Sequence, residues 1–318
     1  MKQPVRLPAA ATNALPRWVL FALCLLYILP GLFGRDPWKT DDAASFGIMW
    51  TMAHGDLQDW LWPHIVGLSA AEKGPLAFWI GALCIKLFGW LLGETMAARV
   101  AAAGFFLLGS LAVWYAAYLL GRRPEAQPLR LAFGGQPEPG DYGRTLADGA
   151  LLIYLGCLGL LLHSHSNSTE ALQVAMVAFS LYAATRLFDS RSIRAAALLG
   201  LALGLLALTR GWVVPLAVYV GLVVLASFRE RALILWMAVV SLPIALLVAG
   251  SWIVASSIVQ PFAGSPIDAW MLWNYRQFGL PSWESLRFFF KNGIWFAWPA
   301  WPVSGGAVEA CRRPYQAP

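Results

Sequence analysis

The sequence predicts an all-α, polytopic transmembrane protein, and three observations lead to this fold class. Of the 318 residues, 59% are hydrophobic and only 13% are charged, whereas a soluble domain is about 25% charged. The mean hydropathy of the chain is +0.60. Apolar runs of about 15 to 25 residues, long enough to cross a bilayer as a helix, recur along the sequence. We therefore expect about eight spans, with juxtamembrane helices in the first outer loop.

The apolar runs are distributed along residues 1–303, which we interpret as one membrane module. The first run is interpreted as an uncleaved span rather than a signal peptide, because it is long and lacks a small-residue cleavage site. The helices are expected near residues 17–34, 75–92, 97–121, 146–162, 171–187, 194–209, 213–227 and 233–258, with a last one beginning near 288.

The distribution of basic residues predicts the orientation of the helices. The net charge of +6 and the pI near 9.3 are attributed to basic cytoplasmic loops rather than to nucleic-acid binding. The basic loops that follow segment 75–92 are all cytoplasmic only if this segment does not cross the membrane. Lys86 in the middle of the segment also makes a full crossing unfavourable. We therefore expect 75–92 to be a juxtamembrane or re-entrant helix. The acidic loop 35–74 then lies on the outer face.

Two adjacent carboxylates, Asp41 and Asp42, end the stretch DPWKTDD at residues 36–42 of this loop. Adjacent carboxylates can have different roles in catalysis, since one carboxylate can accept a proton or position a cation while the second orients the first. The alternative is helix capping, because carboxylates in a first turn bind free N–H groups and favour the helix dipole.

The capping alternative arises because an amphipathic helix is expected over residues 42–54. Phe46, Met49 and Trp50 recur there at helical spacing. Such a helix is expected to lie in the membrane interface with its aromatic side chains at headgroup depth.

Two further features of the expected outer face suit a phosphate. Glu72 and Lys73 precede the 75–92 helix, and an ammonium beside a carboxylate at the membrane surface is a natural ligand for a lipid phosphate. The alternative is that Lys73 snorkels and pairs with Glu72. Arg210 lies at the corner GLLALTRG, residues 204–211. An outward-facing arginine opposes the positive-inside rule unless it has a partner, and a phosphate would supply one.

The turn HSHSNSTE, residues 163–170, adds Glu170 to the outer face. The alternative is a solvated turn in which Ser168 or Thr169 caps the next helix. His163 and His165 lack a third nearby ligand, so a histidine metal site is disfavoured and metal binding is left open. The four cysteines show no metal spacing and predict no disulfide framework. Tryptophans of the outer loops could stack on a sugar: Trp38, Trp60, Trp62, Trp270 and Trp273.

Taken together, these motifs resemble glycosyltransferase family 39 of the GT-C superfamily, which contains protein mannosyltransferases and aminoarabinose transferases. The resemblance covers roughly residues 15–303. It implies that Asp41 is the catalytic acidic residue and Asp42 its acidic neighbour. It also implies that Glu72 and Lys73 lie near the donor phosphate. The sequence departs from the family pattern at three positions. Glu170 stands where members commonly have Asp, and Arg210 where they commonly have Lys. Gly74 replaces a frequent proline, and this glycine is expected to loosen the turn before the 75–92 helix.

The resemblance implies an inverting transfer from a polyprenyl-phosphate sugar to a periplasmic lipid A, protein or glycan acceptor. No cofactor is firmly implied, although a divalent cation could assist the leaving phosphate. The expected location is the bacterial inner membrane, with membrane lipids as partners and the active face periplasmic. Residues 304–318 are expected to be a non-native tail of a truncated product. The alternatives are a non-catalytic membrane fragment or scaffold, and a transporter.

Overall fold

The computed structural model describes residues 8–32, 34, 36–37, 40–70, 72–128, 134–259 and 266–304. Two sequence expectations fall outside these ranges: Trp38 of the first outer loop and, after residue 304, the expected tail.

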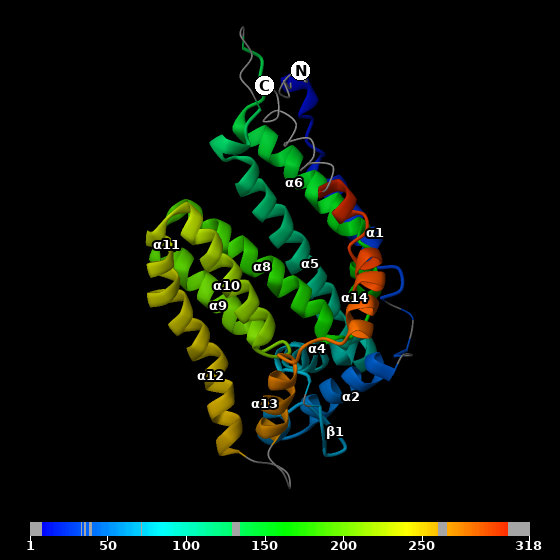
Figure 1. Cartoon of the computed structure of the whole chain (residues 1–318). Coiled ribbons are helices and arrows are strands. Elements are labelled where there is room, and N and C mark those ends of the chain that lie inside the picture. The colour runs from blue at the N-terminus through cyan, green and yellow to red at the C-terminus, as the bar shows by residue number, and fades with distance from the viewer. Residues whose placement is uncertain are drawn as a thin grey trace. The chain divides into compact units, whose positions relative to one another are not determined.

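Within the described ranges the chain is helical apart from one short hairpin, which confirms the all-α fold class (Figure 1). In the hairpin, β1 (His64–Ile65) pairs antiparallel with β2 (Leu68–Ser69). The long and medium helices are α1 (Arg17–Ile28), α2 (Thr40–His54), α4 (Leu76–Leu92), α5 (Glu94–Gly121), α6 (Pro139–Gly156), α8 (Thr169–Ser190), α9 (Ile193–Ala207), α10 (Val213–Arg229), α12 (Leu242–Ile258), α13 (Pro266–Arg276) and α14 (Trp283–Phe296). The short helices are η1 (Ala9–Ala11), α3 (Leu57–Leu61), η2 (Pro124–Ala126), α7 (Leu158–Ser164), α11 (Arg231–Trp236) and the π-helical turn η3 (Met237–Ser241).

Several of these helices are apolar enough for a membrane protein. In the described chain, 3 helices are long and apolar enough to span a bilayer: α5, α8 and the run Arg231–Ile258 formed by α11, η3 and α12. A fourth is possible if α6 and α7, bent by 68°, form one span. Helices α1, α4, α9 and α10 are apolar but shorter. The expected count of about eight spans is therefore not confirmed by helix length.

The segment between the expected spans at 233–258 and near 288 is largely helical where it is described. It contains α13 and the first half of α14. Helix α14 begins at Trp283, after Ser282 accepts a hydrogen bond from the N–H of Ser285 as its N-cap. The last apolar helix therefore starts earlier than the sequence expectation near residue 288, because the capping serine precedes the apolar run.

The chain divides into two compact units. One contains residues 1–27, 110–162 and 281–318, and the other contains residues 28–109 and 163–280. In the first unit, a buried carboxylate joins three segments. Asp148 of α6 accepts hydrogen bonds from Trp114 Nε1 at 2.8 Å and from the N–H of Leu15 at 2.9 Å.

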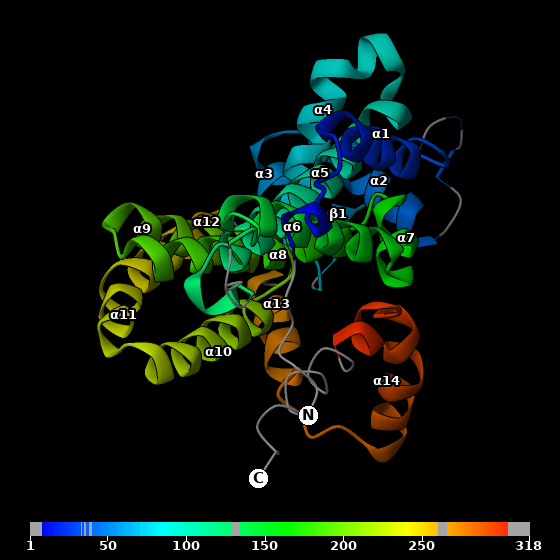
Figure 2. The same ribbon diagram turned by 90° about the horizontal axis from the view of Figure 1, so that it is seen from above.

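The second unit contains a helical core formed by α8 to α11. Buried Leu187, Leu199, Leu233 and Met237 belong to this core. Both views show α9, α10, α11 and α12 grouped beside α8 (Figures 1 and 2). The same unit holds all of the predicted site residues.

Helix α9 approaches the α11–α12 run closely through a pair of glycines four residues apart. A Cβ atom on Gly200 would lie 2.5 Å from the carbonyl oxygen of Ser241, and one on Gly204 would lie 2.7 Å from Val248 Cβ. Small residues at this spacing let the backbones of membrane helices approach each other. The Ser241 hydroxyl in turn donates to the carbonyl of Ala196 at 2.8 Å.

We expect Gly200→Val to destabilise the second unit, because the added side chain would overlap the backbone of Ser241. Overpacking of this kind costs about 1–3 kcal/mol, which a thermal unfolding curve in detergent would detect. Gly221→Val is the matched control, since no atom lies within 4 Å of a Cβ at Gly221. Equal melting temperatures for the two variants would contradict the close contact.

The helix expected at 42–54 is present as α2, but its environment differs from the expectation. Met49, expected on the apolar face of a helix in the membrane interface, is buried with Ile48 and Met52 against Phe78 of α4. Trp50 remains exposed, and its Nε1 donates to Glu94 Oε2 at 2.7 Å. The helix therefore packs mainly on protein, because its buried stripe matches the apolar surface of α4.

Candidate functional site

The turn before α4 and the corner after α9 are held together by their backbones. The N–H of Gly74 donates to the carbonyl of Thr209 at 3.1 Å, and the N–H of Leu76 donates to the carbonyl of Leu208 at 3.1 Å. These bonds bring Lys73 and Arg210, which are far apart in sequence, to neighbouring positions on the backbone.

Gly74 is the reason that this approach is possible. It is buried, and a Cβ atom at this position would overlap the carbonyl oxygen of Leu208. A proline would also lack the N–H that binds Thr209. The expectation that Gly74 loosens the turn is therefore wrong: the glycine permits a close and hydrogen-bonded contact.

Arg210 joins the predicted acidic residues at this corner. Its Nη1 lies 3.0 Å from Glu170 Oε1, and its Nε donates to the backbone carbonyl of Glu72 at 3.4 Å. Its guanidinium lies over the ring of Trp273, 5.6 Å from the centroid. The side chains of Arg210 and Glu170 are 28% and 33% exposed, so this ion pair is accessible to a ligand.

Lys73 links this corner to α2. Its Nζ lies 3.3 Å from Ser45 Oγ. Among the described residues no ion pair joins Lys73 to Glu72, in contrast to the alternative of a paired, snorkelling lysine. Because positions i and i+4 lie on one face of a helix, Asp41 lies one turn before Ser45 on the side of α2 that Lys73 approaches.

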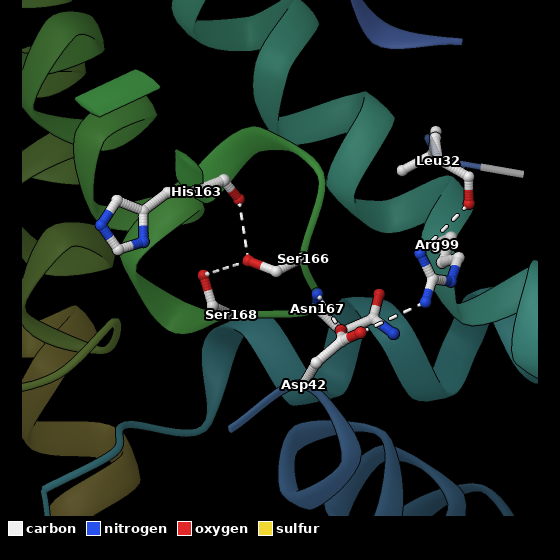
Figure 3. Close-up of polar contacts among 7 residues, drawn as sticks. All are labelled: Leu32, Asp42, Arg99, His163, Ser166, Asn167 and Ser168. Atoms are coloured by element: carbon white, nitrogen blue, oxygen red, sulfur yellow. Dashed lines mark hydrogen bonds and ion pairs between the residues drawn. The ribbon is translucent and has the colours of Figure 1, made fainter. Parts of the chain in front are cut away.

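The adjacent carboxylates Asp41 and Asp42 have different environments. Asp41 is exposed, and within the described part of the chain its carboxylate has no hydrogen-bond or ion-pair partner. Asp42 is 2% exposed. Its Oδ2 lies 3.2 Å from Nη2 of Arg99, and its Oδ1 accepts the N–H of Asn167 at 2.8 Å (Figure 3). The two residues therefore do not present a shared acidic surface.

Arg99 extends the contacts of Asp42 to a further segment. It is fully buried in α5, and its Nη1 donates to the carbonyl of Leu32 at 3.2 Å. Arg99 was not among the site residues predicted from the sequence. The signal for it was a single cation two residues inside the apolar run expected at 97–121, a position where an ionisable residue requires a partner.

The turn at 163–168 is ordered by its own hydroxyl groups. Ser166 Oγ donates to the carbonyl of His163 at 3.0 Å and to Ser168 Oγ at 3.3 Å (Figure 3). Ser168 stands at the N-cap position of α8, although its hydroxyl does not cap the helix. Among the residues that the structure describes, no three His, Cys, Asp or Glu side chains form a metal-binding cluster.

Two of the five predicted sugar-stacking tryptophans have structural roles instead. Trp62 and Trp270 are each 3% exposed, and they lie 5.3 and 5.4 Å from the ring of Trp252. The Nε1 of Trp270 also donates to the carbonyl of Arg210 at 3.0 Å. The expectation that these two rings are free to contact a sugar is wrong, whereas Trp273 remains partly exposed beside Arg210.

Comparison with known proteins confirms the resemblance to aminoarabinose transferases. No protein-family model matches the chain. The undecaprenyl phosphate-α-4-amino-4-deoxy-L-arabinose arabinosyl transferase of Aeromonas salmonicida is 29% identical over 249 residues, which are 78% of this chain and 42% of the relative. The protein of the same name from Pseudomonas aeruginosa is 32% identical over 209 residues, 63% of this chain and 33% of the relative. The chain is a distant homologue of this aminoarabinose transferase, ArnT.

Solved structures of ArnT share the fold. ArnT from Cupriavidus metallidurans matches the chain with a TM-score of 0.57, both in the apo state at 21% identity and bound to undecaprenyl phosphate at 23% identity. Each match covers 77% of this chain and 42% of ArnT. The chain therefore spans less than half the length of the ArnT proteins that it matches, and it has an ArnT-like arrangement of apolar membrane helices.

Proposed function

We propose that the chain is a membrane glycosyltransferase that takes a sugar from a polyprenyl-phosphate donor. The observation that carries this proposal is the backbone contact that brings Lys73 and Arg210 together in the second unit. Helix periodicity adds Asp41, one turn before the Ser45 that Lys73 contacts. The relatives named for an undecaprenyl-phosphate aminoarabinose donor support it, as does the ArnT structure bound to undecaprenyl phosphate. These relatives favour aminoarabinose over mannose as the sugar.

In this proposal Asp41 is the general base. Its carboxylate accepts the proton of an acceptor hydroxyl, whose oxygen attacks the anomeric carbon while the bond to the polyprenyl phosphate breaks. The phosphate leaves with the bonding electrons, and the configuration of the sugar is inverted. An exposed carboxylate without a partner among the described residues is available for this proton transfer.

Lys73 and Arg210 would stabilise the leaving phosphate. Each has N–H groups beyond those used by Ser45, Glu170 and the Glu72 carbonyl, and cationic donors stabilise the charge that develops on a leaving oxygen. A phosphate would displace the Glu170 carboxylate from Arg210 or share the guanidinium with it. A divalent cation that assists this neutralisation remains a prediction.

The proposed location is the bacterial inner membrane, with this region on the periplasmic face. There the donor must be lipid-linked, because nucleotide sugars are made in the cytoplasm. The proposed acceptor is lipid A, a protein or another glycan. A total of about eight spans requires the α6–α7 pair and the shorter helices α1, α9, α10 and α14 to cross the membrane as well, the short helices with some local thinning of the bilayer.

The proposal is tested by incubating membranes that contain the chain with radiolabelled undecaprenyl-phosphate aminoarabinose and lipid A. We expect label in the acceptor fraction above that of membranes without the chain. Binding of the donor without any transfer to lipid A, protein or glycan would indicate a donor-binding protein and not an enzyme. Absence of both binding and transfer would contradict the proposal and favour a scaffold.

A further inference from the structure

The buried ion pair between Asp42 and Arg99 connects three segments around the first turn of α2. Through Arg99 it reaches the carbonyl of Leu32, in the segment that follows α1. Through its other oxygen, Asp42 holds the N–H of Asn167 in the turn before α8. The side chains of Arg99 and Asp42 are 0% and 1% exposed. Neither of them can therefore contact a substrate directly in this arrangement.

Such a pair contributes little net stability relative to apolar residues of similar size, since burial removes both charges from water. It does impose one geometry. The planar guanidinium of Arg99 binds the Asp42 carboxylate through Nη2 and the Leu32 carbonyl through Nη1. The two carboxylate oxygens of Asp42 bind Arg99 and the N–H of Asn167. A helix turn held in this way has a fixed rotation about the helix axis.

That rotation determines the direction of the neighbouring residue. Asp41 is one position away on the same turn, about 100° around the helix from Asp42, and it is exposed. Lys73 meets the next turn at Ser45. If the first turn of α2 frayed or rotated, the Asp41 carboxylate would move relative to Lys73, although both residues would still be present.

We propose that Asp42 and Arg99 form a positioning pair that fixes the direction of the Asp41 carboxylate. The inference rests on the proposed function for its effect on transfer. Asp42 is then a positioning residue that acts through the geometry of α2, and Asp41 alone of the two contacts the acceptor.

The test is the double variant Asp42→Asn/Arg99→Met, which removes both buried charges together. Because both charged groups are removed, the variant leaves no uncompensated buried charge. The asparagine also keeps a side-chain oxygen that can accept the N–H of Asn167. The matched control is Arg191→Met/Glu230→Gln, which neutralises an ion pair of 2.6 Å in the same unit whose side chains are 59% and 32% exposed. Melting temperature, donor Kd, kcat and hydrogen exchange of the 44–48 amides are measured for each.

For the folded double variant we expect an unchanged donor Kd, because Lys73 and Arg210 are untouched. We expect a fall in kcat of about 10²-fold, the size of effect that a misplacement of about 1 Å can produce. Exchange of the 44–48 amides should be faster than in the parent and the control. Unchanged kcat, or reduced kcat with unchanged exchange, would overturn the proposal, the latter because Asp42 would then act in the chemistry itself.

The exchange measurement separates this inference from the proposed function. Suppose that the parent transfers no sugar, but that the 44–48 amides of the double variant exchange faster while amide exchange in α9 is unchanged. The proposed function then fails, and the role of the ion pair in fixing the first turn of α2 is supported. If exchange is also unchanged, both are overturned.

Discussion

Replacing Asp41 by asparagine is expected to reduce kcat for sugar transfer by about 10²–10⁴-fold, the usual contribution of a general base. Asparagine has nearly the same shape but cannot accept the acceptor's proton. Because Asp41 is exposed and its carboxylate has no partner among the described residues, the fold should be unaffected. The measurement is the initial rate of label transfer at saturating donor, together with the melting temperature.

The control for this variant is Asp36→Asn, which removes another exposed carboxylate from the same outer loop. It should transfer sugar at the rate of the parent. An Asp41→Asn variant that keeps the parent's kcat would exclude Asp41 as the base. Equal losses in both variants would indicate a general effect of loop charge, which would fall at high salt.

Arg99→Met alone is expected to lower the free energy of unfolding by about 3–5 kcal/mol. The variant leaves the Asp42 carboxylate buried without its cation, and it also leaves the carbonyl of Leu32 without the Arg99 donor. The loss should appear as a lower melting temperature in detergent and should largely recover when Asp42→Asn is added, because the buried charge is then removed.

The matched single variant is Arg191→Met, whose side chain is 59% exposed and whose partner Glu230 is partly exposed. Exposed pairs contribute about 0–1 kcal/mol, so its melting temperature should change little. If Arg99→Met were no less stable than Arg191→Met, the Asp42 charge would have to be solvated or neutral in the folded protein, contrary to its burial.

The fold class could be predicted from the sequence because it depends on composition. Apolar runs of bilayer length have few alternatives to helices, since backbone groups in lipid must be satisfied within the segment. The number of spans could not be predicted in the same way. The break between α6 and α7, and the short helices α9 and α10, depend on tertiary packing that hydropathy does not describe.

The candidate site was predictable in its outline. Charged residues such as Lys73 and Arg210 are rare in an apolar chain, and each has to be explained. The sequence did not reveal which of two adjacent carboxylates is buried. That difference depends on Arg99, which lies 57 residues from Asp42 along the chain and meets it only after α2 packs beside α5. Composition likewise could not show that the rings of Trp62 and Trp270 would pack against the ring of Trp252.

Binding of undecaprenyl phosphate to the purified chain tests the central claim, a donor-phosphate site at Lys73 and Arg210, most directly. We expect saturable binding, measured by native mass spectrometry or by quenching in nanodiscs. Lys73→Met and Arg210→Met should each raise the Kd roughly 10- to 150-fold, since a hydrogen bond to a charged group contributes about 1.5–3 kcal/mol. Lys86→Met, which removes an exposed lysine of α4, should leave the Kd unchanged. Equal affinity in the parent and all three variants would contradict a phosphate site at Lys73 and Arg210.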